Sequence, residues 1–307
     1  MKLVFDVGGT RVKYGVADEE GNFLFTGEIP TPHDSPEAFL LLVKNIYRQA
    51  EQSVRIDGAA FGFPGEVYSE EGVIRGISAV EYLHELPLKE LLAGCFDRRI
   101  PVTMANDANC AALGELWKGI AREHQNVAFV ICGTGIGGAV IEQGKLYTGS
   151  TMNRGEFGNY PMGGYQDGML LTWSDYTLEK QARKYHDRNG FNLSVNGREL
   201  EELAVNGDRE ARILMTEFYH WMAVGCINVE FSFDPQMIAI GGGISNNDRI
   251  IKGIQDTVNQ MLYGQHSGYL VPRIVACMKG SQANLYGALY YHLNPGVINS
   301  SEKEKIK

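Results

Sequence analysis

Cysteine is scarce in this chain, and its few cysteines are widely separated. None of them is related to another by a C-x-C or C-x-x-C spacing, and the seven histidines lie at no metal-ligand spacing from them. This pattern excludes a disulfide scaffold and indicates no zinc site. We therefore expect reduced, mostly buried thiols in a cytoplasmic protein. The five cysteines are Cys95, Cys110, Cys132, Cys226 and Cys277.

An excess of positive charge and long hydrophobic runs are absent as well. Lysine and arginine number 28 against 37 aspartate and glutamate residues, which gives a formal net charge of −9. This balance argues against nucleic acid or an anionic membrane surface as the main partner. The longest apolar stretch, Val127 to Ile141, is interrupted by glycines, so we expect no transmembrane helix. Because Lys2 to Phe5 already has the pattern of a strand, we expect no signal peptide either.

Glycine, by contrast, is abundant and gathers in three segments that each come after a short apolar run typical of a strand. Glycine lets the chain turn tightly and brings bare N–H groups close to a phosphate. The three segments therefore predict backbone cradles for a nucleotide. They are DVGGTRVKYG (Asp6–Gly15), CGTGIGGAVIEQG (Cys132–Gly144) and AIGGGIS (Ala239–Ser245).

Strand and helix patterns alternate along the chain. Leu3–Asp6 and Val12–Ala17 predict a strand hairpin that feeds helices, and Val127–Cys132 with Gly138–Ile141 predicts a second hairpin of the same kind. The repetition, over 307 residues, indicates two similar α/β halves facing a cleft. The other predicted elements are strands at Phe23–Ile29, Gly58–Phe63, Pro101–Ala105 and Met237–Ile240, and helices at Ser35–Gln52, Pro87–Phe96, Asp107–Lys118, Glu210–Phe233 and Ala283–His292.

The first glycine segment offers more than a turn. Asp6 stands at the strand end, where a carboxylate can hold Mg²⁺ through water, and Thr10 can add a hydroxyl donor to the N–H groups of Gly8 and Gly9. Lys13 comes next on the hairpin and can bring a positive charge near the same phosphates. The alternative is an ordinary glycine hairpin turn in which Asp6 makes a turn hydrogen bond.

The second and third glycine segments lead into different kinds of element. Gly133–Gly138 precedes the strand-like Ala-Val-Ile and no helix, which disfavours a dinucleotide site of the Rossmann type and favours a second phosphate hairpin. A flexible glycine loop remains the alternative. Gly241–Gly243 precedes a helix near Asn247 and can let adenine and ribose lie flat on the backbone, although a strand-to-helix turn needs glycine in any case.

Asn106 and Asp107 come directly after a strand and open a helix. Both residue types are favoured as helix caps, which is the simpler interpretation. Between two phosphate cradles, however, an aspartate at this place can accept the proton of an alcohol that attacks a phosphate. The transition state of such a transfer is loose, so the base needs position more than a raised pKa.

Polar groups suited to a sugar occur on two loops. The tight turn Gly62–Gly65 can contact hydroxyls through its backbone, and the carboxylate of Glu156 can accept two hydroxyl hydrogen bonds. Asn159 lies three residues beyond Glu156. The alternative for Glu156 is a surface ion pair with Arg154.

Taken together and in this order, the motifs resemble those of the ROK family (repressor, open reading frame, kinase) over nearly the whole chain. The resemblance implies an actin-like, hexokinase-type α/β fold with a sugar and ATP in a central cleft. It also implies Asp107 as the catalytic base, Asn106 and Glu156 as sugar-binding residues, and Mg²⁺ and phosphates facing Asp6, Gly8, Gly9, Thr10, Thr134 and Gly135, with Gly242 and Gly243 facing the adenosine. The motifs are D-x-G-G-T-x-x-K (Asp6–Lys13), G-x-P-G-x-V (Gly62–Val67), N-D-A-N (Asn106–Asn109), G-T-G-I-G-G (Gly133–Gly138), G-E-x-G (Gly155–Gly158) and G-G-G-I-S (Gly241–Ser245).

Two departures from the family pattern concern zinc and the sugar. Where many members have a histidine and then a cysteine-rich zinc cluster, this chain has Asn159 and a segment, YPMGGYQDGMLLTWSDY, without cysteine. Ser174 stands near the place of a glutamate that often touches the sugar. We therefore expect no structural zinc and a loop held by packing, for which Met162, Met169, Leu170, Leu171 and Trp173 are available. Zinc-free members that phosphorylate β-glucosides have a similar loop.

These observations predict an ATP- and Mg²⁺-dependent kinase that acts on the 6-hydroxyl of a hexose or β-glucoside, working as a homodimer in the cytoplasm. Residues 1–110 with 283–307 are expected to form the smaller domain and residues 111–282 the larger one. The alternatives are another hexose kinase of the family, such as an N-acylmannosamine kinase, and a sugar-responsive regulator without a DNA-binding domain. The family's repressors add an N-terminal helix-turn-helix, and because the pattern of the first strand begins at Lys2 we expect none here.

Overall fold

The structure is a computed structural model that describes residues 1–33, 35–76, 78–166, 168–189, 195–263 and 271–300. The chain packs into two compact units: unit 1 is Met1–Glu123, Ile141–Arg154 and Ser281–Lys307, and unit 2 is His124–Val140 and Gly155–Gly280. The predicted domains divide the chain at other positions and stay a prediction. Residues 301–307, which belong to the predicted smaller domain, lie outside the described residues.

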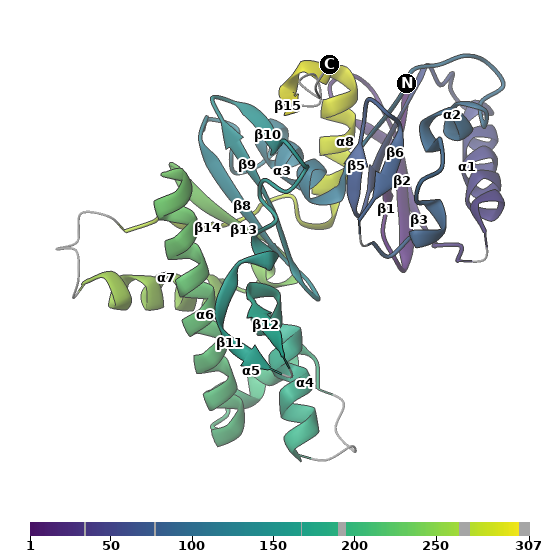
Figure 1. Cartoon of the computed structure of the whole chain (residues 1–307). Coiled ribbons are helices and arrows are strands. Elements are labelled where there is room, and N and C mark those ends of the chain that lie inside the picture. Colours follow the sequence, from purple (N-terminus) through teal and green to yellow (C-terminus); the bar gives the residue numbers. More distant parts are fainter. Residues whose placement is uncertain (34, 77, 167, 190–194, 264–270, 301–307) are drawn as a thin grey trace. The chain divides into compact units, whose positions relative to one another are not determined.

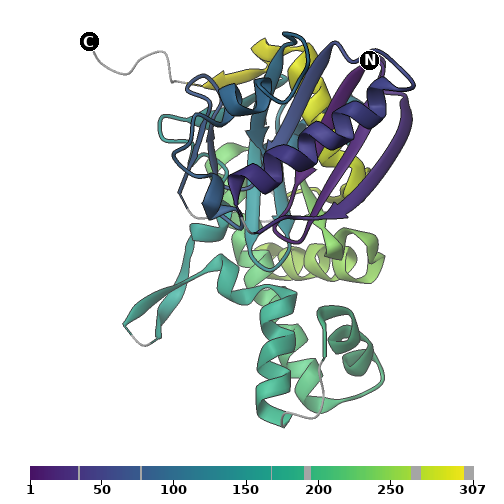
Figure 2. The same ribbon diagram turned by 90° about the vertical axis from the view of Figure 1, so that its right-hand side faces the viewer.

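The core of unit 1 is a five-stranded sheet in the order β3-β2-β1-β4-β7 (Figures 1 and 2). β1 and β2 form the predicted antiparallel hairpin, in which Lys2 pairs with Ala17 and Val7 with Val12. β4 runs parallel to β1, and β7 runs parallel to β4, so the carboxyl ends of all three strands meet at one edge. The strands are β1 (Lys2–Val7), β2 (Arg11–Ala17), β3 (Phe23–Pro30), β4 (Gly58–Phe63) and β7 (Val102–Asn106).

Helices cover both faces of this sheet because successive strand residues alternate between the faces. Phe5 belongs to a hydrophobic cluster with Phe39 of α1 (Pro36–Glu51), whereas its neighbour Val4 belongs to one with Leu289 of α8 (Ala283–Leu293). Figure 2 shows α1 lying across one face of the strands, with α8 behind them. The hydroxyl of Ser35 accepts a hydrogen bond from the Ala38 N–H, so the predicted cap of α1 is confirmed.

Glycines let helix α3 cross α8 closely in unit 1. A Cβ on Gly287 would lie 1.7 Å from the carbonyl oxygen of Cys110, and one on Gly114 would lie 2.1 Å from that of Ala283.

The predicted helix 87–96 is wrong in length, because the observed helix spans only Leu88–Ala93. The short strands of this unit were not predicted from the sequence. The elements are β5 (Glu66–Tyr68), β6 (Val73–Arg75), α2 (Leu88–Ala93), α3 (Asp107–Lys118), β10 (Lys145–Gly149) and β15 (Ile298–Ser300), with short 3-10 turns at Glu81–Leu83, Gly280–Gln282 and Pro295–Val297.

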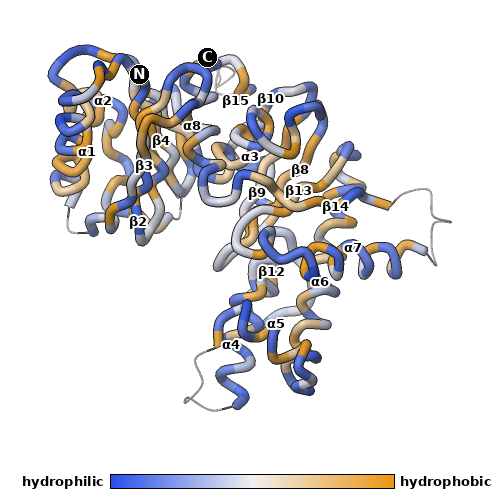
Figure 3. The backbone as a smooth tube through the Cα atoms, turned by 180° about the vertical axis from the view of Figure 1, so that it is seen from behind, coloured by the Kyte–Doolittle hydropathy of each residue, from blue (hydrophilic) through white to orange (hydrophobic). Residues whose placement is uncertain are grey.

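A second sheet has the order β14-β13-β8-β9-β10-β15, and the division between the units falls within β9. In unit 2, β13 is parallel to both β8 and β14. The tube of β8 and β13 is mainly hydrophobic in Figure 3, as expected for strands buried on both faces. The predicted second hairpin is present. The elements are β8 (Val127–Cys132), β9 (Ile136–Glu142), β13 (Met237–Gly242), β14 (Ile274–Ala276), α6 (Arg209–Phe233) and α7 (Asp248–Tyr263).

The segment in place of the family's zinc cluster forms an antiparallel hairpin in unit 2. Trp173 and Met162 are buried, as expected for a loop held by packing, but Met169 is 71% exposed and Leu170 is 42% exposed. The expectation that these two residues pack is therefore wrong, because the outer part of the hairpin projects from the unit (Figure 2). The remaining elements are β11 (Pro161–Gln166), β12 (Met169–Thr172), α4 (Leu178–Asn189) and α5 (Gly197–Val205), with 3-10 turns at Phe157–Asn159, Trp173–Tyr176 and Gly243–Asn246. Within the described ranges, no helix combines the length and hydrophobicity needed to cross a bilayer.

Candidate active site

Three predicted site segments meet at one edge of the unit 1 sheet. Asp6 is in register with Gly62, and Gly62 is in register with Ala105, immediately before Asn106. The carboxyl ends of parallel strands are where open α/β sheets bind ligands. The strand order thus brings together a carboxylate, a tight turn and a helix start that are far apart in the sequence.

Asp6 is buried and bound from a distant helix. The residue is only 8% exposed, and Asn284 at the start of α8 donates a hydrogen bond to its Oδ1 at 2.9 Å. The Nζ of Lys13 lies 3.9 Å from Oδ2 and donates to the carbonyl of Ser281 at 3.4 Å. Burial raises the pKa of Asp6, while the Asn284 hydrogen bond and the Lys13 charge act in the opposite direction.

This environment fits a magnesium ion bound together with a nucleotide. Mg²⁺ in such sites uses one or two carboxylates and completes its shell with phosphate oxygens and waters. Asp6 supplies one carboxylate with an oriented oxygen. A cage of three or more acidic, histidine or cysteine side chains is not found in the part of the chain that the structure describes.

The hairpin turn after β1 is held from Thr31, just beyond β3, and is closely packed. Thr31 donates through its hydroxyl to the carbonyl of Gly8 at 2.6 Å and through its N–H to the carbonyl of Thr10 at 3.0 Å. A Cβ on Gly9 would lie 2.5 Å from the Cβ of Ala79, so a side chain has no room there. Thr10 itself is exposed. The Gly8 N–H donates to the carbonyl of Arg11 at 2.9 Å and is therefore engaged within the turn, so Thr10 is the exposed residue of Gly8–Thr10.

Asn106 caps helix α3 and also fixes the sugar-type turn. Its Oδ1 accepts a hydrogen bond from the Asn109 N–H at 3.0 Å, and its Nδ2 donates to the carbonyl of Gly65 at 2.9 Å. The predicted cap is confirmed, and the contact with Gly65 joins two predicted site residues. Asp107 is the first residue of α3, and its Oδ1 accepts from the Ala108 N–H at 2.8 Å. The helix dipole favours a negative charge at this end, which suits a carboxylate that acts as a proton acceptor.

The second glycine loop lies in unit 2 between β8 and β9. The N–H of Gly133 donates to the carbonyl of Gly135 at 2.9 Å, which closes a tight turn. Ser174 accepts a hydrogen bond from the Ile136 N–H at 3.0 Å, and the hydroxyl of Thr177 donates to the carbonyl of Thr134 at 3.3 Å. A strand comes after the loop, as predicted, and two side chains brace it while Gly133 and Thr134 stay exposed.

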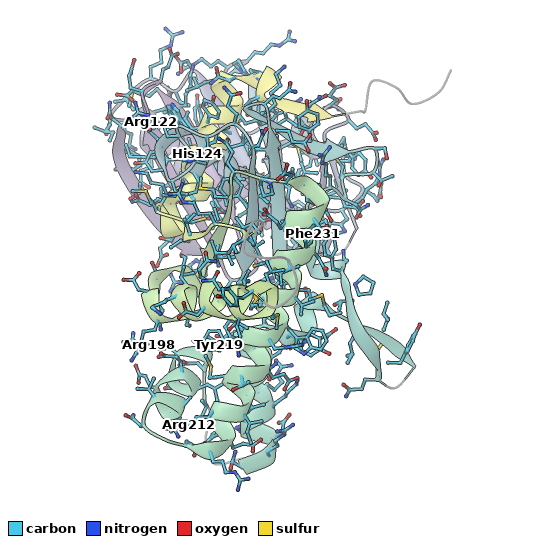
Figure 4. All side chains as sticks on the ribbon, turned by 90° about the vertical axis from the view of Figure 1, so that its left-hand side faces the viewer. Arg122, His124, Arg198, Arg212, Tyr219 and Phe231 are labelled. Atoms are coloured by element: carbon cyan, nitrogen blue, oxygen red, sulfur yellow. The ribbon has the colours of Figure 1, made fainter. Side chains whose placement is uncertain are left out.

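The third glycine segment forms one wall of a cavity of about 630 Å³ in unit 2. Gly242 has a φ of +83°, and a Cβ there would lie 1.8 Å from the carbonyl oxygen of Cys132, so only glycine fits. A Cβ on Gly243 would meet no atom within 4 Å, because this residue faces open space. The other walls include Gly133, the buried Glu201, which pairs with Arg249 at 3.0 Å, and the exposed Arg198 (Figure 4). The volume lies within the usual range for small-molecule and cofactor sites, roughly 300–1,000 Å³.

Glu156 immediately precedes a single 3-10 turn, Phe157–Asn159, in unit 2, and Asn159 is the last residue of that turn. A Cβ on Gly158 would lie 2.0 Å from the carbonyl oxygen of Ile136, so the turn packs directly on the second glycine loop. Asn159 is exposed and Glu156 is partly exposed. Arg154, the alternative partner of Glu156, forms an ion pair with Glu142.

The predicted site residues thus form two sets, one in each unit. Sequence reasoning did not include Asn284 or Thr31. An asparagine at a helix start predicts a cap, and nothing in its spacing indicates a contact with Asp6. The two sets are Asp6, Gly8, Gly9, Thr10, Lys13, Gly65, Asn106 and Asp107 in unit 1, and Thr134, Gly135, Glu156, Asn159, Gly242 and Gly243 in unit 2.

Comparison with known proteins shows what the chain is related to. Residues 3–294 match the ROK family. The chain belongs to the ROK family. It is 30% identical over 305 residues to the N-acetyl-D-glucosamine kinase of Citrobacter koseri, covering 94% of this chain and 98% of that protein.

Solved structures of ROK proteins have the same fold. A ROK family protein from Streptococcus pneumoniae in complex with sucrose is 31% identical, with a TM-score of 0.86 over 96% of this chain and 99% of the other. A ROK family glucokinase from Streptomyces griseus in complex with glucose and AMPPNP is 26% identical, with a TM-score of 0.76 over 94% and 97% of the two chains. The predicted actin-like α/β fold and the family assignment are confirmed.

Proposed function

We propose that this ROK protein is an ATP-dependent sugar kinase that phosphorylates the 6-hydroxyl of a hexose or β-glucoside. The observation that carries the proposal is the arrangement of Asn106 and Asp107. Asn106 is fixed both to the start of α3 and to Gly65, which leaves the adjoining Asp107 carboxylate in a defined position at the helix N-terminus.

Both units offer groups that would hold Mg-ATP. Asp6 would bind the magnesium ion, and the turn of Gly8 to Thr10 with the loop at Thr134 and Gly135 would bind phosphates. The cavity beside Gly242 and Gly243 would take the adenosine. When bound, Mg-ATP supplies the phosphoryl group and neutralises part of its charge.

The chain's own part in the reaction is to orient the sugar and to accept a proton. Gly65, Asn106, Glu156 and Asn159 would hold the sugar hydroxyls. Asp107 would accept the proton of the attacking hydroxyl, and position contributes more to this role than basicity does because the transition state is loose. Closure of a site around the sugar would exclude water that otherwise attacks ATP.

The sugar itself is the finer part of the proposal. The segment without cysteine or histidine, together with an amide at Asn159 and a small side chain at Ser174, supports room beside the anomeric end of the sugar, and hence a glucose unit with a β-linked substituent. A second candidate, N-acetylglucosamine, is favoured by the 30% identity to a kinase named for that sugar.

We also propose that the protein is a homodimer. Sedimentation equilibrium of the purified protein would test this proposal.

The test is an ADP-release assay with glucose, cellobiose, N-acetylglucosamine and N-acetylmannosamine, using wild type and Asp107→Asn. The amide keeps an oxygen for the Ala108 N–H but loses the acceptor charge, so turnover with the best sugar should fall by about 10²–10⁴-fold without loss of folding. Asp97→Asn, an exposed position outside the site, is the control and should match wild type.

Near-wild-type turnover of Asp107→Asn would contradict the proposed role of Asp107 as the base. Strong turnover of glucose with none of cellobiose would contradict the β-glucoside preference.

A further inference from the structure

A short segment of unit 1, Ser78 and Ala79, adjoins both of the predicted site turns in that unit. A Cβ on Gly65, in the turn assigned to the sugar, would lie 3.0 Å from the Cβ of Ser78. A Cβ on Gly9, in the turn assigned to phosphates, would lie 2.5 Å from the Cβ of Ala79. Ser78 is partly exposed and Ala79 is exposed, so the segment remains open to a ligand at the place where the two turns come together.

The side chain of Ser78 is held by a histidine from the same loop. Its Oγ lies 2.6 Å from Nε2 of His84 and accepts a hydrogen bond from the Val80 N–H at 3.2 Å. Both partners are themselves fixed, because Val80 is fully buried in the core of unit 1 and the N–H of His84 donates to the carbonyl of Glu81 at 3.0 Å. The serine hydroxyl therefore has a defined position.

The tautomer of His84 decides what the Ser78 hydroxyl can still offer to a ligand. A hydroxyl has one hydrogen to donate and two lone pairs with which to accept, and the Val80 N–H uses one lone pair. If Nε2 of His84 accepts, the hydroxyl donates to it and keeps one lone pair. If Nε2 carries the proton, the hydroxyl accepts from it and keeps its hydrogen. In both cases one hydrogen-bonding function is left over, and His84 sets its direction.

The surroundings of Ser78 make a sugar hydroxyl the expected partner for this function. Gly65, which adjoins Ser78, accepts a hydrogen bond from Asn106 at 2.9 Å, and Asp107 follows Asn106 in the chain. A hexose carries hydroxyls around its whole ring, so a sugar held by Asn106 and Asp107 presents further hydroxyls to the neighbouring wall. The alternative is that Ser78 and His84 only close the loop between them.

We propose that Ser78 binds a hydroxyl of the substrate sugar and that His84 is a positioning residue that sets the direction of this hydrogen bond. The inference rests on the proposed kinase function and adds a specificity determinant to it. The Ser78 hydroxyl can serve only one position of the ring, so the pair selects among sugars by the group at that position. A sugar hydroxyl both donates and accepts, whereas a carbonyl oxygen only accepts, so the state of His84 decides which of them Ser78 takes.

Four substitutions test the pair, two that remove a group and two that keep it. Ser78→Ala removes the hydroxyl, and Ser78→Thr keeps it. His84→Phe keeps a ring but removes the polar partner, and His84→Gln keeps a polar group of similar reach. Ser53→Ala, at an exposed serine just after α1, is the control for the loss of a hydroxyl. Thermal unfolding establishes that each variant is folded before kinetics are measured.

Steady-state kinetics with the best sugar measures what the pair contributes. Ser78→Ala and His84→Phe should each raise the KM for the sugar by about three- to tenfold, the usual effect of one hydrogen bond. The kcat and the KM for ATP should stay within about twofold of wild type, since the contact is made equally before and during the reaction. Ser78→Thr and His84→Gln should recover most of the loss. The double variant should be no worse than Ser78→Ala, because His84 acts through the serine.

Deoxy forms of the same sugar separate a contact with the substrate from a role in closing the loop. If Ser78 binds one hydroxyl, removing this hydroxyl from the sugar should raise the KM of wild type but cause no further rise in Ser78→Ala. The other deoxy sugars should lose the same factor with both proteins. A loop-closing role would instead weaken every deoxy sugar by the same additional factor in the variant.

Calorimetric titration of the sugar without ATP tests the pair even if the protein phosphorylates no sugar. Binding that Ser78→Ala and His84→Phe weaken, with the dependence on a single ring hydroxyl described above, would then support the pair while the proposed function fails. Wild-type KM values in both variants, or equal additional losses for every deoxy sugar, would overturn the inference and leave the proposed kinase function standing. No measurable sugar binding to wild type would overturn both.

Discussion

At the scale of single residues, the candidate site in unit 1 contains one buried carboxylate, that of Asp6. Burial raises the pKa of Asp6, and two partners oppose this effect: the amide of Asn284 and the charge of Lys13. The amide of Asn284 donates a direct hydrogen bond at 2.9 Å, whereas the Lys13 ammonium lies 3.9 Å away. Asn284 therefore orients Oδ1 of Asp6, while Oδ2 lies on the side of the Lys13 ammonium.

Asn284→Leu should weaken the use of Mg-ATP while sparing the sugar. The substitution removes the donor, so Asp6 loses its orientation, and we expect kcat/KM for ATP to fall by about tenfold with a rise in the Mg²⁺ concentration needed for half-maximal rate. The KM for the sugar should stay within about twofold of wild type. Asn294→Leu, at the other end of α8, is the control. A rise in the sugar KM alone would show that Asn284 has another role.

At the scale of elements, many candidate site residues lie at the ends of strands, and glycines at these ends determine how closely neighbouring strands pack. Gly242 at the end of β13 has a φ of +83° and lies against the carbonyl of Cys132 on β8, whereas the next residue, Gly243, faces open space. The two adjacent glycines therefore have different structural roles. Gly242 permits close packing of the two strands, and Gly243 leaves space in the cavity.

Alanine substitutions should separate these tasks. Gly242→Ala forces a Cβ to 1.8 Å from a carbonyl oxygen at a positive φ, so we expect a loss of about 2–5 kcal/mol in unfolding free energy. Gly243→Ala should leave the melting temperature close to wild type and change only the KM for ATP. Equal melting temperatures for the two variants would contradict this division.

The end of α8 also predicts a pH dependence of stability. His292 hydrogen-bonds the Thr103 hydroxyl at 2.9 Å, and burial, helped by Lys2 and opposed by Asp57 and Glu19, lowers its pKa from 6.5 to about 4. The unfolded chain therefore binds a proton that the folded chain excludes. The stabilisation from neutral His292 is complete above pH 6.5 and is lost as the pH falls towards 4.

Urea unfolding at about pH 7.5 and about pH 5.0 should show this effect. We expect a loss of about 2 kcal/mol from this residue, since one pKa unit corresponds to about 1.4 kcal/mol. His292→Asn keeps a polar partner for Thr103 but does not titrate, so its stability should depend less on pH. The prediction is wrong if wild type and variant lose the same amount.

At the scale of the whole molecule, each of the two units supplies part of the predicted site. In unit 2, one segment stands in place of the family's zinc cluster, and it packs against the core of that unit. Trp173 is fully buried, and a Cβ on Gly225 of α6 would lie 2.1 Å from its ring. The 3-10 turn that begins at Trp173 also carries Ser174, which braces the second glycine loop. Apolar packing and one hydroxyl thus connect this segment to the site.

Purified protein should accordingly contain no stoichiometric zinc. Structural zinc needs about four nitrogen or sulfur ligands, and residues 159–176 include neither cysteine nor histidine. Elemental analysis should find no zinc, and a chelator should leave the melting temperature unchanged. One zinc per chain, or a lower melting temperature with chelator, would refute the prediction.

Features that depend on neighbouring residues could be predicted from the amino-acid sequence alone. The hairpin of β1 and β2, the Ser35 and Asn106 caps and the bounds of α3 result from alternation, turn residues and capping preferences, all of which act within a few positions. The order of the glycine motifs likewise identified the family.

The meeting of distant side chains could be seen only in the folded protein. Asn284 reaches Asp6 across 278 residues, and the Ser174 hydroxyl reaches the Ile136 N–H across 38. Local patterns carry no information on such contacts. They depend on strand order and on how closely helices cross, which are set by the packing of the whole core.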